Sequence, residues 1–365
     1  MATGTFRVTV RDTTGPVITA PEGVTEEATG PGGATVTYVA TAEDLVDGTV
    51  DATCTPASGW LFDLGLTTVT CTATDDRGNE TSSMFDVSVR DTTAPGVTVP
   101  STIVREATGP GGAVATWTAS ATDIVDGAIT PGCTPPSGAL FGLGTTRVTC
   151  SATDAHDNTG RAGFDVVVRD TTGPELRLPA NVTAVATSAA GAPVTWSASA
   201  TDLVSGARPV TCSPTGGGVF APGTTTVSCS ASDGNGNTTA GSFTVTVTFG
   251  WNGFFAPVDN NGVYNVIKAG QSVPLKWNVP NGSGGWIGSL SVVRSVTQTK
   301  VTCQTAAPAD EIEAPTSGAT ELRYDTTANQ FVYNWQSPKV GAGTCYRLGV
   351  TLTDGSSRTA LFRTK

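Results

Sequence analysis

Short stretches of alternating apolar and polar residues run along most of this chain, and turn-forming residues separate them. Residues 34–44, ATVTYVATAED, alternate with a period of two, which predicts a half-buried strand. Residues 62–75 hold a turn and then a strand, and residues 82–91 read as a closing strand after the hairpin turn DDRGN. Gly and Pro in residues 28–34, ATGPGGA, supply turn angles that strands do not use. No apolar run approaches the roughly 18 residues of a membrane-spanning helix. The pattern predicts an all-β protein.

The same pattern returns every 79 residues, because DTTGP at 12–16 recurs as DTTAP at 91–95 and DTTGP at 170–174. Other positions keep this register: Tyr38, Trp117 and Trp196; Asp44, Asp123 and Asp202; Asp75, Asp154 and Asp233; Phe6, Phe85, Phe164 and Phe243. Repeated short strands with turns between them predict immunoglobulin-like β-sandwiches, with the Tyr38 register in the core. We expect three such repeats, followed by a distinct C-terminal β-sandwich. Their expected bounds are residues 12–90, 91–169, 170–249 and 250–365.

The cysteines occur as one pair in each unit. Three pairs are 17 residues apart and the fourth lies in the last segment: Cys54 and Cys71, Cys133 and Cys150, Cys212 and Cys229, Cys303 and Cys345. A metal site on these residues is disfavoured, because the chain has no CxxC and its single His is at position 156. We expect four disulfides, and closing a loop of about 17 residues contributes roughly 3 kcal/mol. Disulfides indicate an oxidising location outside the cytoplasm.

The repeated unit, DTTxP…TATD…C…F…G…TTxVTCxATD…GN…FxVxVRD, resembles the HYR (hyalin repeat) domain over residues 12 to about 248. The resemblance implies an immunoglobulin-like module of extracellular proteins that is associated with adhesion. The last segment resembles a bacterial C-terminal module with a PxKF signature, which reads Pro274-Leu275-Lys276-Trp277 here. That module often follows such repeats in secreted actinobacterial proteins, and the resemblance implies no known activity for it.

The chain begins with what looks like part of a further repeat. Residues 4–14, GTFRVTVRDTT, match the closing strands SMFDVSVRDTT and AGFDVVVRDTT. We therefore expect residues 1–11 to be either the closing strand of a preceding repeat or a strand donated to a neighbouring molecule. The beginning MATGTFRVTV has no basic and apolar leader, so no signal peptide is expected.

Composition disfavours catalysis. Charged residues make up 14% of the chain, and residues 1–250 contain no Lys. The single His156 follows a repeat turn and is expected to be solvated. Asp44 and Asp47 form a carboxylate pair of the kind that glycosidases use, but they recur in repeats that otherwise look structural. We expect no catalytic residue and no enzyme activity.

Charge is concentrated in the repeats. Residues 1–250 carry 10 Arg against 24 acidic residues, within a net charge of −11 for the whole chain. Such an acidic body repels nucleic acid and anionic membranes and suits cations. The alternative is that the charge simply maintains solubility.

Aspartate is the candidate ligand for such cations. Each repeat has a linker Asp, a second one 32 residues on and a third 63 residues on: Asp12, Asp44 and Asp75; Asp91, Asp123 and Asp154; Asp170, Asp202 and Asp233. The entry linker, the loop after the second strand and the final hairpin share one end of a sandwich, so these carboxylates should cluster near each junction. Clustered oxygens suit Ca²⁺. Asp47 and Asp126 could add ligands, Ser205 weakens the third site, and Glu27 and Glu106 face the next junction. The alternative is that each Asp caps its own turn.

These features predict a non-catalytic extracellular structural and adhesive protein, in which disulfide-stapled repeats form a stalk that presents the C-terminal module. Four of the seven Trp lie in that module, mostly in its expected core, and Trp286 in a Gly-rich loop is the candidate binding residue. Expected partners are a protein, a cell-surface glycan or copies of the chain itself, without nucleic acid or membrane insertion. Alternatives are a self-assembling bacterial surface filament, a phage virion appendage or decoration protein, and a binding stalk of an absent catalytic domain. The expected location is extracellular or on the bacterial surface, or in the virion for the phage alternative.

Overall fold

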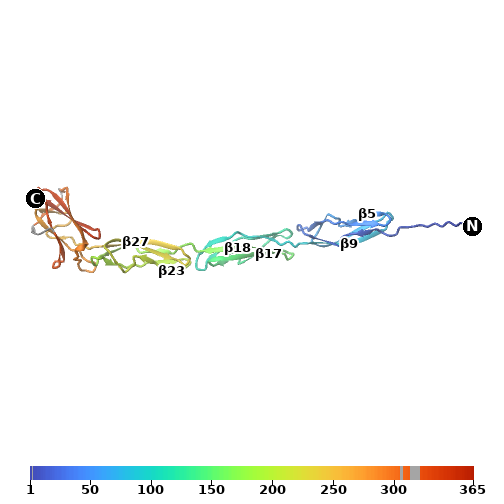
Figure 1. Cartoon of the computed structure of the whole chain (residues 1–365), viewed down its shortest axis with the longest axis horizontal. Helices are drawn as coiled ribbons and strands as arrows, with labels where there is room; N and C mark the ends of the chain where they lie inside the picture. Colours follow the sequence, from blue (N-terminus) through green and yellow to red (C-terminus); the bar gives the residue numbers. More distant parts are fainter. Residues whose placement is uncertain (2, 305–306, 313–320) are drawn as a thin grey trace. The chain divides into compact units, whose positions relative to one another are not determined.

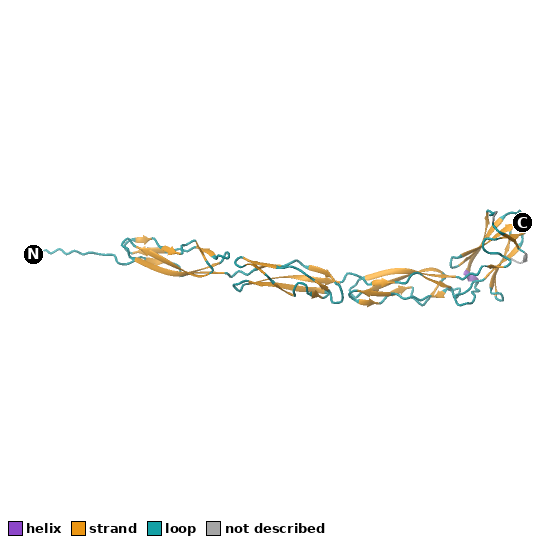
Figure 2. Ribbon diagram, turned by 180° about the vertical axis from the view of Figure 1, so that it is seen from behind, coloured by secondary structure: helices purple, strands orange, loops and turns teal. Residues whose placement is uncertain are grey.

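The computed structural model describes residues 1, 3–304, 307–312 and 321–365. Figure 2 shows that strands and loops make up this part of the chain, and its only helix is a 3₁₀ turn, η1 (Leu290–Val292). The chain divides into two compact units, Met1–Asp170 and Thr171–Lys365. The first unit contains two repeats. The second unit contains the third repeat and the C-terminal domain. No helix in the described part of the chain has the length and apolar character that crossing a membrane requires.

The first repeat is a small sandwich. Its four-stranded sheet has the order β2 (Gly23–Glu27), β9 (Glu80–Arg90), β8 (Gly65–Thr74) and β6 (Thr53–Thr55). The opposing strands are β1 (Val17–Thr19), β4 (Thr41–Asp44) and β5 (Gly48–Val50), with a separate pair formed by β3 (Ala34–Val36) and β7 (Trp60–Phe62). Alternate residues of β8 and β9, including Val69, Phe85 and Val87, form the core. This is the period-two burial that the alternating sequence predicts.

The prediction of one strand over residues 34–44 is wrong. The segment forms β3 and β4, which belong to different sheets, and residues 37–40 lie between them. The chain leaves β3 at Tyr38, whose backbone N–H donates to Ser58 Oγ (2.8 Å) while Ser58 Oγ donates to the Tyr38 carbonyl (2.7 Å). The Ser58 side chain thus replaces the backbone hydrogen bonds of a strand pair at the point where the chain changes sheets. The Tyr38 ring is half-buried and packs edge-to-face on Phe85 with centroids 4.9 Å apart.

The other two repeats repeat this order of strands and the same three sheets. The second repeat consists of β10 (Gly96–Thr98), β11 (Ile103–Glu106), β12 (Ala113–Val114), β13 (Ser120–Asp123), β14 (Gly127–Ile129), β15 (Gly132–Thr134), β16 (Leu140–Phe141), β17 (Gly144–Thr153) and β18 (Thr159–Arg169). The third consists of β19 (Glu175–Arg177), β20 (Val182–Val185), β21 (Ala192–Pro193), β22 (Ser199–Asp202), β23 (Gly206–Arg208), β24 (Thr211–Ser213), β25 (Val219–Phe220), β26 (Gly223–Ser232) and β27 (Thr238–Thr248).

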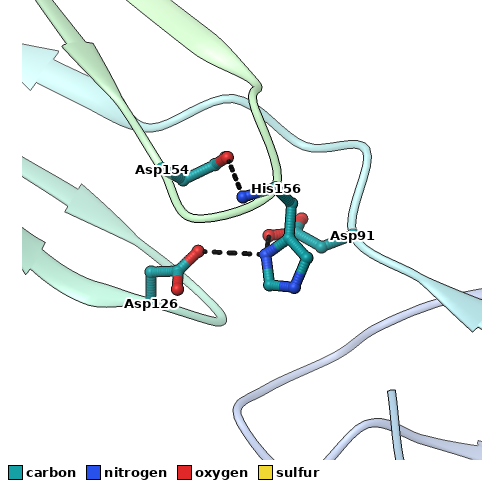
Figure 3. Close-up of side chains that lie close together, drawn as sticks. All are labelled: Asp91, Asp126, Asp154 and His156. Atoms are coloured by element: carbon teal, nitrogen blue, oxygen red, sulfur yellow. Dashed lines mark hydrogen bonds and ion pairs between the residues drawn. The ribbon is translucent and has the colours of Figure 1, made fainter. Parts of the chain in front are cut away.

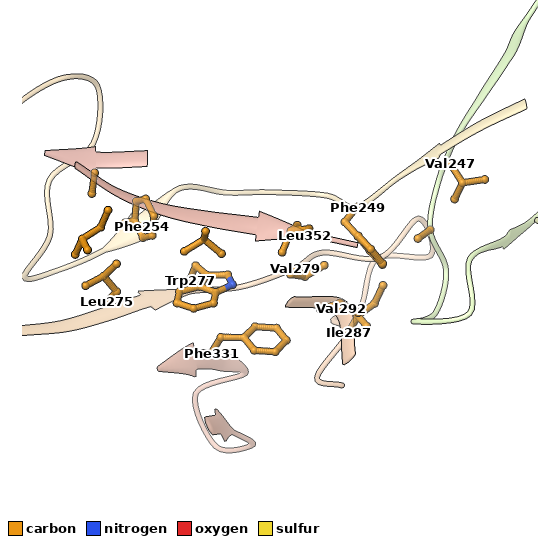
Figure 4. Close-up of a cluster of buried hydrophobic side chains, with 14 of the residues drawn as sticks. Val247, Phe249, Phe254, Leu275, Trp277, Val279, Ile287, Val292, Phe331 and Leu352 are labelled. Carbon is orange, nitrogen blue, oxygen red and sulfur yellow. The ribbon is translucent and has the colours of Figure 1, made fainter. Parts of the chain in front are cut away.

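The C-terminal domain is a different β-sandwich with a larger core. One sheet has the order β28 (Phe254–Phe255), β30 (Ser272–Trp277), β34 (Gln330–Gln336) and β33 (Leu322–Asp325). The other has the order β31 (Val293–Val301), β35 (Cys345–Leu352), β36 (Ser357–Thr364), β29 (Tyr264–Ile267) and β32 (Ala309–Glu311). Figure 4 shows Trp277 and Phe331 within its core, where their rings stack 5.6 Å apart.

Four disulfides join the cysteines, with one pair in each repeat and one in the C-terminal domain: Cys54–Cys71, Cys133–Cys150, Cys212–Cys229 and Cys303–Cys345. In each repeat the two cysteines lie directly opposite each other on neighbouring strands of the four-stranded sheet. The bond therefore ties an edge strand to the sheet.

The segment before β1 forms no strand over residues 3–16. Figure 1 shows it as the dark-blue trace that leads into the first repeat. Phe6, Val8 and Val10, which correspond in sequence to core residues of β9, are exposed. Whether this segment completes a repeat or is donated to a neighbouring molecule stays a prediction.

Candidate functional site: carboxylate clusters at the repeat ends

The first repeat gathers four aspartates at one end. Asp12 lies in the entry linker, Asp44 ends β4, Asp47 lies in the turn before β5, and Asp75 follows β8. Each offers one carboxylate oxygen, and these oxygens all lie within 4.8 Å of one another. The sandwich topology causes this meeting, because the linker, the turn between β4 and β5 and the hairpin between β8 and β9 share that end.

One oxygen of each strand-end aspartate satisfies its own turn. Asp44 Oδ1 accepts the backbone N–H groups of Val46 (2.7 Å) and Asp47 (3.0 Å). Asp75 Oδ1 accepts those of Arg77 (2.9 Å) and Asn79 (2.8 Å). These are Asx-type turns, so the alternative of turn capping also describes real contacts. Capping occupies one oxygen of Asp44, whereas Asp75 Oδ2 also accepts the side-chain amide of Asn79 (2.6 Å).

The second oxygen of several aspartates is buried without a hydrogen-bond partner. The four oxygens of this kind among the described residues are Asp12 Oδ2, Asp91 Oδ2, Asp123 Oδ2 and Asp154 Oδ2. Burying a carboxylate oxygen without a compensating donor or cation is costly. Only the linker position recurs in this set, as Asp12 Oδ2 and Asp91 Oδ2, and the latter lies 3.3 Å from His156 Nδ1.

The second repeat has a related group that includes an imidazole (Figure 3). Asp91, Asp126, Asp154 and His156 each contribute one ligand atom, and these atoms also lie within 4.8 Å of one another. His156 Nδ1 is 3.3 Å from Asp91 Oδ2 and 3.3 Å from Asp126 Oδ2. His156 is exposed, as predicted for a solvated turn residue, but its ring also lies against these carboxylates, which the sequence did not predict. The hairpin that begins at Asp154 turns the ring toward the linker and the β13–β14 turn.

Asp123 is not a member of this group, although the register predicted it as a ligand. Its Oδ1 accepts the backbone N–H groups of Val125 (2.7 Å) and Asp126 (3.1 Å), and its Oδ2 has no partner. Asp126 takes its place, as Asp47 joins the group in the first repeat. The sequence signal for both was their shared register in the loop after β4 or β13.

The third repeat keeps two of these carboxylates in equivalent turns. Asp202 Oδ1 accepts the N–H groups of Val204 (2.9 Å) and Ser205 (2.6 Å). Asp233 Oδ2 accepts the side-chain amide of Asn237 (2.6 Å). Ser205 stands where the other repeats have Asp47 and Asp126, and its Oγ accepts the N–H of Gly234 (3.3 Å). Asp170, the linker counterpart of Asp12 and Asp91, is the last residue of the first unit and is buried.

The turns keep these carboxylates ionised. Burial acts to raise the pKa of Asp75, but the side-chain amide and backbone N–H of Asn79 and the N–H of Arg77 hold it below its ordinary value. Asp233 has a lowered pKa for the same reasons. A hydrogen bond to Asp126 raises the pKa of His156, with smaller contributions from the charges of Asp126, Asp91 and Asp154. Hydrogen bonds in these turns thus favour the ionised forms of Asp75 and Asp233.

Glu27 lies at the opposite end of the first repeat and accepts hydrogen bonds from the linker to the second repeat. Its carboxylate accepts the N–H of Thr92 (2.8 Å), the Thr92 hydroxyl (2.7 Å) and the Thr93 hydroxyl (2.8 Å). The backbone N–H and hydroxyl of Thr92 and the hydroxyl of Thr93 hold the pKa of Glu27 below its ordinary value. Glu27 therefore binds the linker backbone and is not in the cluster around Asp91.

In the C-terminal domain the aromatic residues divide between core and surface. Trp277 and Trp335 are buried, whereas Trp286 is 42% exposed in the Gly-rich loop beside Pro280. Its position allows contact with a partner.

Tandem disulfide-bonded β-sandwiches with carboxylates gathered at their ends define a class of immunoglobulin-like extracellular repeat proteins. The HYR domain family model matches residues 11–89, 90–168 and 169–247. The chain belongs to the HYR domain family.

Two sea-urchin proteins are similar to this chain. Hyalin of Strongylocentrotus purpuratus is 32% identical over 346 residues, which covers 90% of this chain and 28% of hyalin. Hyalin of Lytechinus variegatus is 36% identical over 190 residues, covering 48% of this chain and 36% of that protein. The chain thus spans about a third of the length of these relatives, or less.

Two of the solved structures that match this chain have low sequence identity to it. The protocadherin GammaB4 extracellular domain is 14% identical, with 98% of this chain and 68% of that chain covered and a TM-score of 0.29. The human desmocollin-1 ectodomain is 9% identical, with 96% and 79% covered and a TM-score of 0.27. The tandem disulfide-bonded repeats and their relation to hyalin are consistent with an extracellular structural or adhesion role.

Proposed function

We propose that this chain is a non-catalytic structural and adhesive protein of the cell exterior whose repeat ends bind Ca²⁺. The observation that carries the proposal is the carboxylate-only cluster at the end of the first repeat, in which Asp12 Oδ2 is buried without a hydrogen-bond partner. Ca²⁺ takes six to eight oxygen ligands and accepts irregular geometry. Four aspartates in the first cluster offer up to eight carboxylate oxygens, of which Asp12 Oδ1, Asp44 Oδ1, Asp47 Oδ2 and both oxygens of Asp75 already accept hydrogen bonds.

A cation at this place would fasten three separate elements together. In the first repeat these are the entry linker, the β4–β5 turn and the β8–β9 hairpin, which otherwise meet through few direct bonds. The side-chain amide of Asn79 reaches the Asp12 carbonyl at 3.5 Å, and the Asp76 N–H reaches Asp47 Oδ2 at 3.3 Å. Both are long hydrogen bonds. Ion binding therefore stiffens the entry to the repeat.

The C-terminal domain supplies the second part of the function, which is docking to a partner. Residues Pro274–Trp277, the PxKF-like signature, lie within β30. This signature supports the assignment of the C-terminal domain as a bacterial PxKF-type module. We assign partner contact to the loop of Trp286, with a protein or a surface glycan as the ligand. The disulfides support a location outside the cell as part of this proposal.

The calcium proposal is tested with the substitution Asp47→Ser in the full chain. The third repeat carries serine at this position, where the hydroxyl still accepts a turn N–H. Melting is measured by calorimetry in Ca²⁺ and in chelator. A ligand at 100 times its Kd stabilises by about 2.7 kcal/mol. We expect Asp47→Ser to reduce the Ca²⁺-dependent gain in Tm and to leave the Tm in chelator unchanged.

Asp51→Ser is the matched control, because Asp51 is exposed and lies outside the cluster. It removes the same charge and should keep the full response to Ca²⁺. Equal losses for Asp47→Ser in Ca²⁺ and in chelator would mean that Asp47 only orders its turn. A wild-type Tm that ignores Ca²⁺ would reject the proposal.

A further inference from the structure

The cluster of the second repeat differs from that of the first in one ligand atom, and the difference is chemical. Among the described residues, the first cluster contains carboxylates only, whereas the second contains the imidazole of His156 with three carboxylates. Hard cations such as Ca²⁺ prefer oxygen ligands, whereas imidazole suits first-row transition ions and zinc. The two clusters are therefore not built for the same ion.

The spacing of the ligand atoms matches a small tetrahedral ion. His156 Nδ1 lies 3.3 Å from both Asp91 Oδ2 and Asp126 Oδ2. Zinc binds nitrogen and oxygen at about 2.0–2.2 Å, and tetrahedral geometry places such ligand atoms about 3.3–3.5 Å apart. Three elements supply these atoms: the linker, the β13–β14 turn and the hairpin after β17 (Figure 3).

Buried oxygens at the same place point independently to a ligand. Asp154 is 8% exposed and its Oδ2 accepts no hydrogen bond, and the Oδ2 of Asp91, which is 6% exposed, has His156 Nδ1 at 3.3 Å as its ion-pair partner. Asp154 Oδ1 is already satisfied by the backbone N–H groups of His156 (2.8 Å) and Asn158 (2.8 Å). Its Oδ2 thus remains as the fourth ligand atom, beside the carboxylate oxygens of Asp91 and Asp126 and the imidazole nitrogen of His156.

We propose that Asp91, Asp126, Asp154 and His156 form a zinc-type site that is specific to the second repeat. The inference rests on the proposed function only in that both assign cations to the repeat ends. Zinc would fix the linker from the first repeat to two loops of the second. This junction would then respond to a different metal from the carboxylate-only cluster at Asp12.

The test uses Co²⁺ as a spectroscopic probe of the zinc site in the intact chain, at mildly alkaline pH where metals bind the neutral imidazole. Four-coordinate Co²⁺ absorbs strongly in the visible range, and Zn²⁺ should abolish this signal by displacement. The chain has a single histidine, so its imidazole NMR signals report on this site alone. We expect one Co²⁺ per chain and a shift of those signals with Zn²⁺.

The repeats themselves supply two matched variants. His156→Asn introduces the residue of the third repeat, Asn235, and His156→Arg that of the first, Arg77. Both retain the backbone N–H that donates to Asp154, so the turn is expected to fold. Each should weaken Zn²⁺ binding by more than about tenfold, since even indirect contributors to metal sites are worth this much. The response to Ca²⁺ at the first cluster should be unchanged.

The outcomes separate this inference from the calcium proposal. Tetrahedral Co²⁺ binding that both His156 variants retain would overturn the inference, because the imidazole would not be a ligand. So would the absence of Zn²⁺ binding in a chain that binds Ca²⁺, which would leave His156 as an ion-pair partner of its aspartates. Zn²⁺ binding that depends on His156 in a chain without any Ca²⁺ response would sustain the inference and reject the calcium proposal.

Discussion

Two junctions in this molecule use the same β framework and opposite chemistry. The junction between the first and second repeats has Asp91 at the start of the linker and Glu27 across from it. Two repeat lengths further along the chain, the same register positions hold Phe249 and Val185. Polar residues thus join the first repeat to the second, and apolar residues join the third repeat to the C-terminal domain.

The polar junction consists of hydrogen bonds around a small apolar contact. Glu27 accepts three bonds from Thr92 and Thr93, and the Asn158 side-chain amide donates to the Asp91 carbonyl (3.2 Å). Val125, from the loop after β13, packs with the core cluster of the first repeat. Most of these contacts are hydrogen bonds, and three of them end on the carboxylate of Glu27.

The apolar junction is an extension of a core. Phe249 is 3% exposed and belongs to one buried cluster that includes Val247 of the third repeat and Trp277 of the C-terminal domain (Figure 4). Its backbone N–H donates to Asp354 Oδ2 (2.8 Å). The Gly282 N–H donates to the Ala186 carbonyl (3.0 Å), which binds the two domains a second time. At this position of the register, phenylalanine thus replaces aspartate and becomes part of a core that the two domains share.

The largest expected effect comes from breaking the apolar junction with Phe249→Ala. Truncating a buried phenylalanine costs about 3–5 kcal/mol. Urea unfolding followed by tryptophan fluorescence reports mainly on the second unit, Thr171–Lys365, which contains five of the seven Trp. We expect its transition to shift to lower urea and to split as the third repeat and the C-terminal domain uncouple.

Phe6→Ala is the control for this substitution, because Phe6 is exposed. It should change the free energy of unfolding by less than about 0.5 kcal/mol. A similarly small change for Phe249→Ala would show that the two domains do not share a core.

Much of this arrangement could be predicted from the sequence, because the 79-residue register and strand alternation fix which loops share an end. That reasoning brings Asp12, Asp44 and Asp75 together. It does not distinguish Asp123 from Asp126, because the choice depends on which oxygen the turn N–H groups occupy. The presence of phenylalanine at this register position could also be predicted, because Phe249 lies one 79-residue repeat after Asp170.

The orientation of His156 could not be predicted from the pattern. A turn histidine whose register position holds other residue types in the other repeats is expected to be solvated, and the His156 side chain is in fact 35% exposed. Its ring direction depends on the hairpin geometry and on the linker carboxylate that the preceding residues place beside it. The break between β3 and β4 is similar, since alternation continues while hydrogen bonding passes to Ser58.

An effect of intermediate size is expected at the small apolar contact of the polar junction. Val125 is 8% exposed, whereas Val46, at the same register position in the first repeat, is 59% exposed. Each methyl group removed from a buried position costs about 0.8 kcal/mol, so Val125→Ala should cost about 1–2 kcal/mol. Hydrogen exchange of the β9 amides measures this as lost protection. Val46→Ala should leave protection unchanged, and equal effects for the two variants would mean that Val125 does not couple the repeats.

The smallest expected effect is the pH response of Glu27. Because its pKa is lowered in the folded chain, its bonds to Thr92 and Thr93 stabilise the junction above the ordinary glutamate pKa. That contribution is lost as the pH falls through the lower pKa of the folded state. The Thr92 amide chemical shift should follow this titration with a midpoint below the ordinary value, and Glu27→Gln should abolish it. A midpoint at or above the ordinary value would show that the linker does not stabilise the carboxylate, and the polar junction would then depend on its metal ligands and Val125 alone.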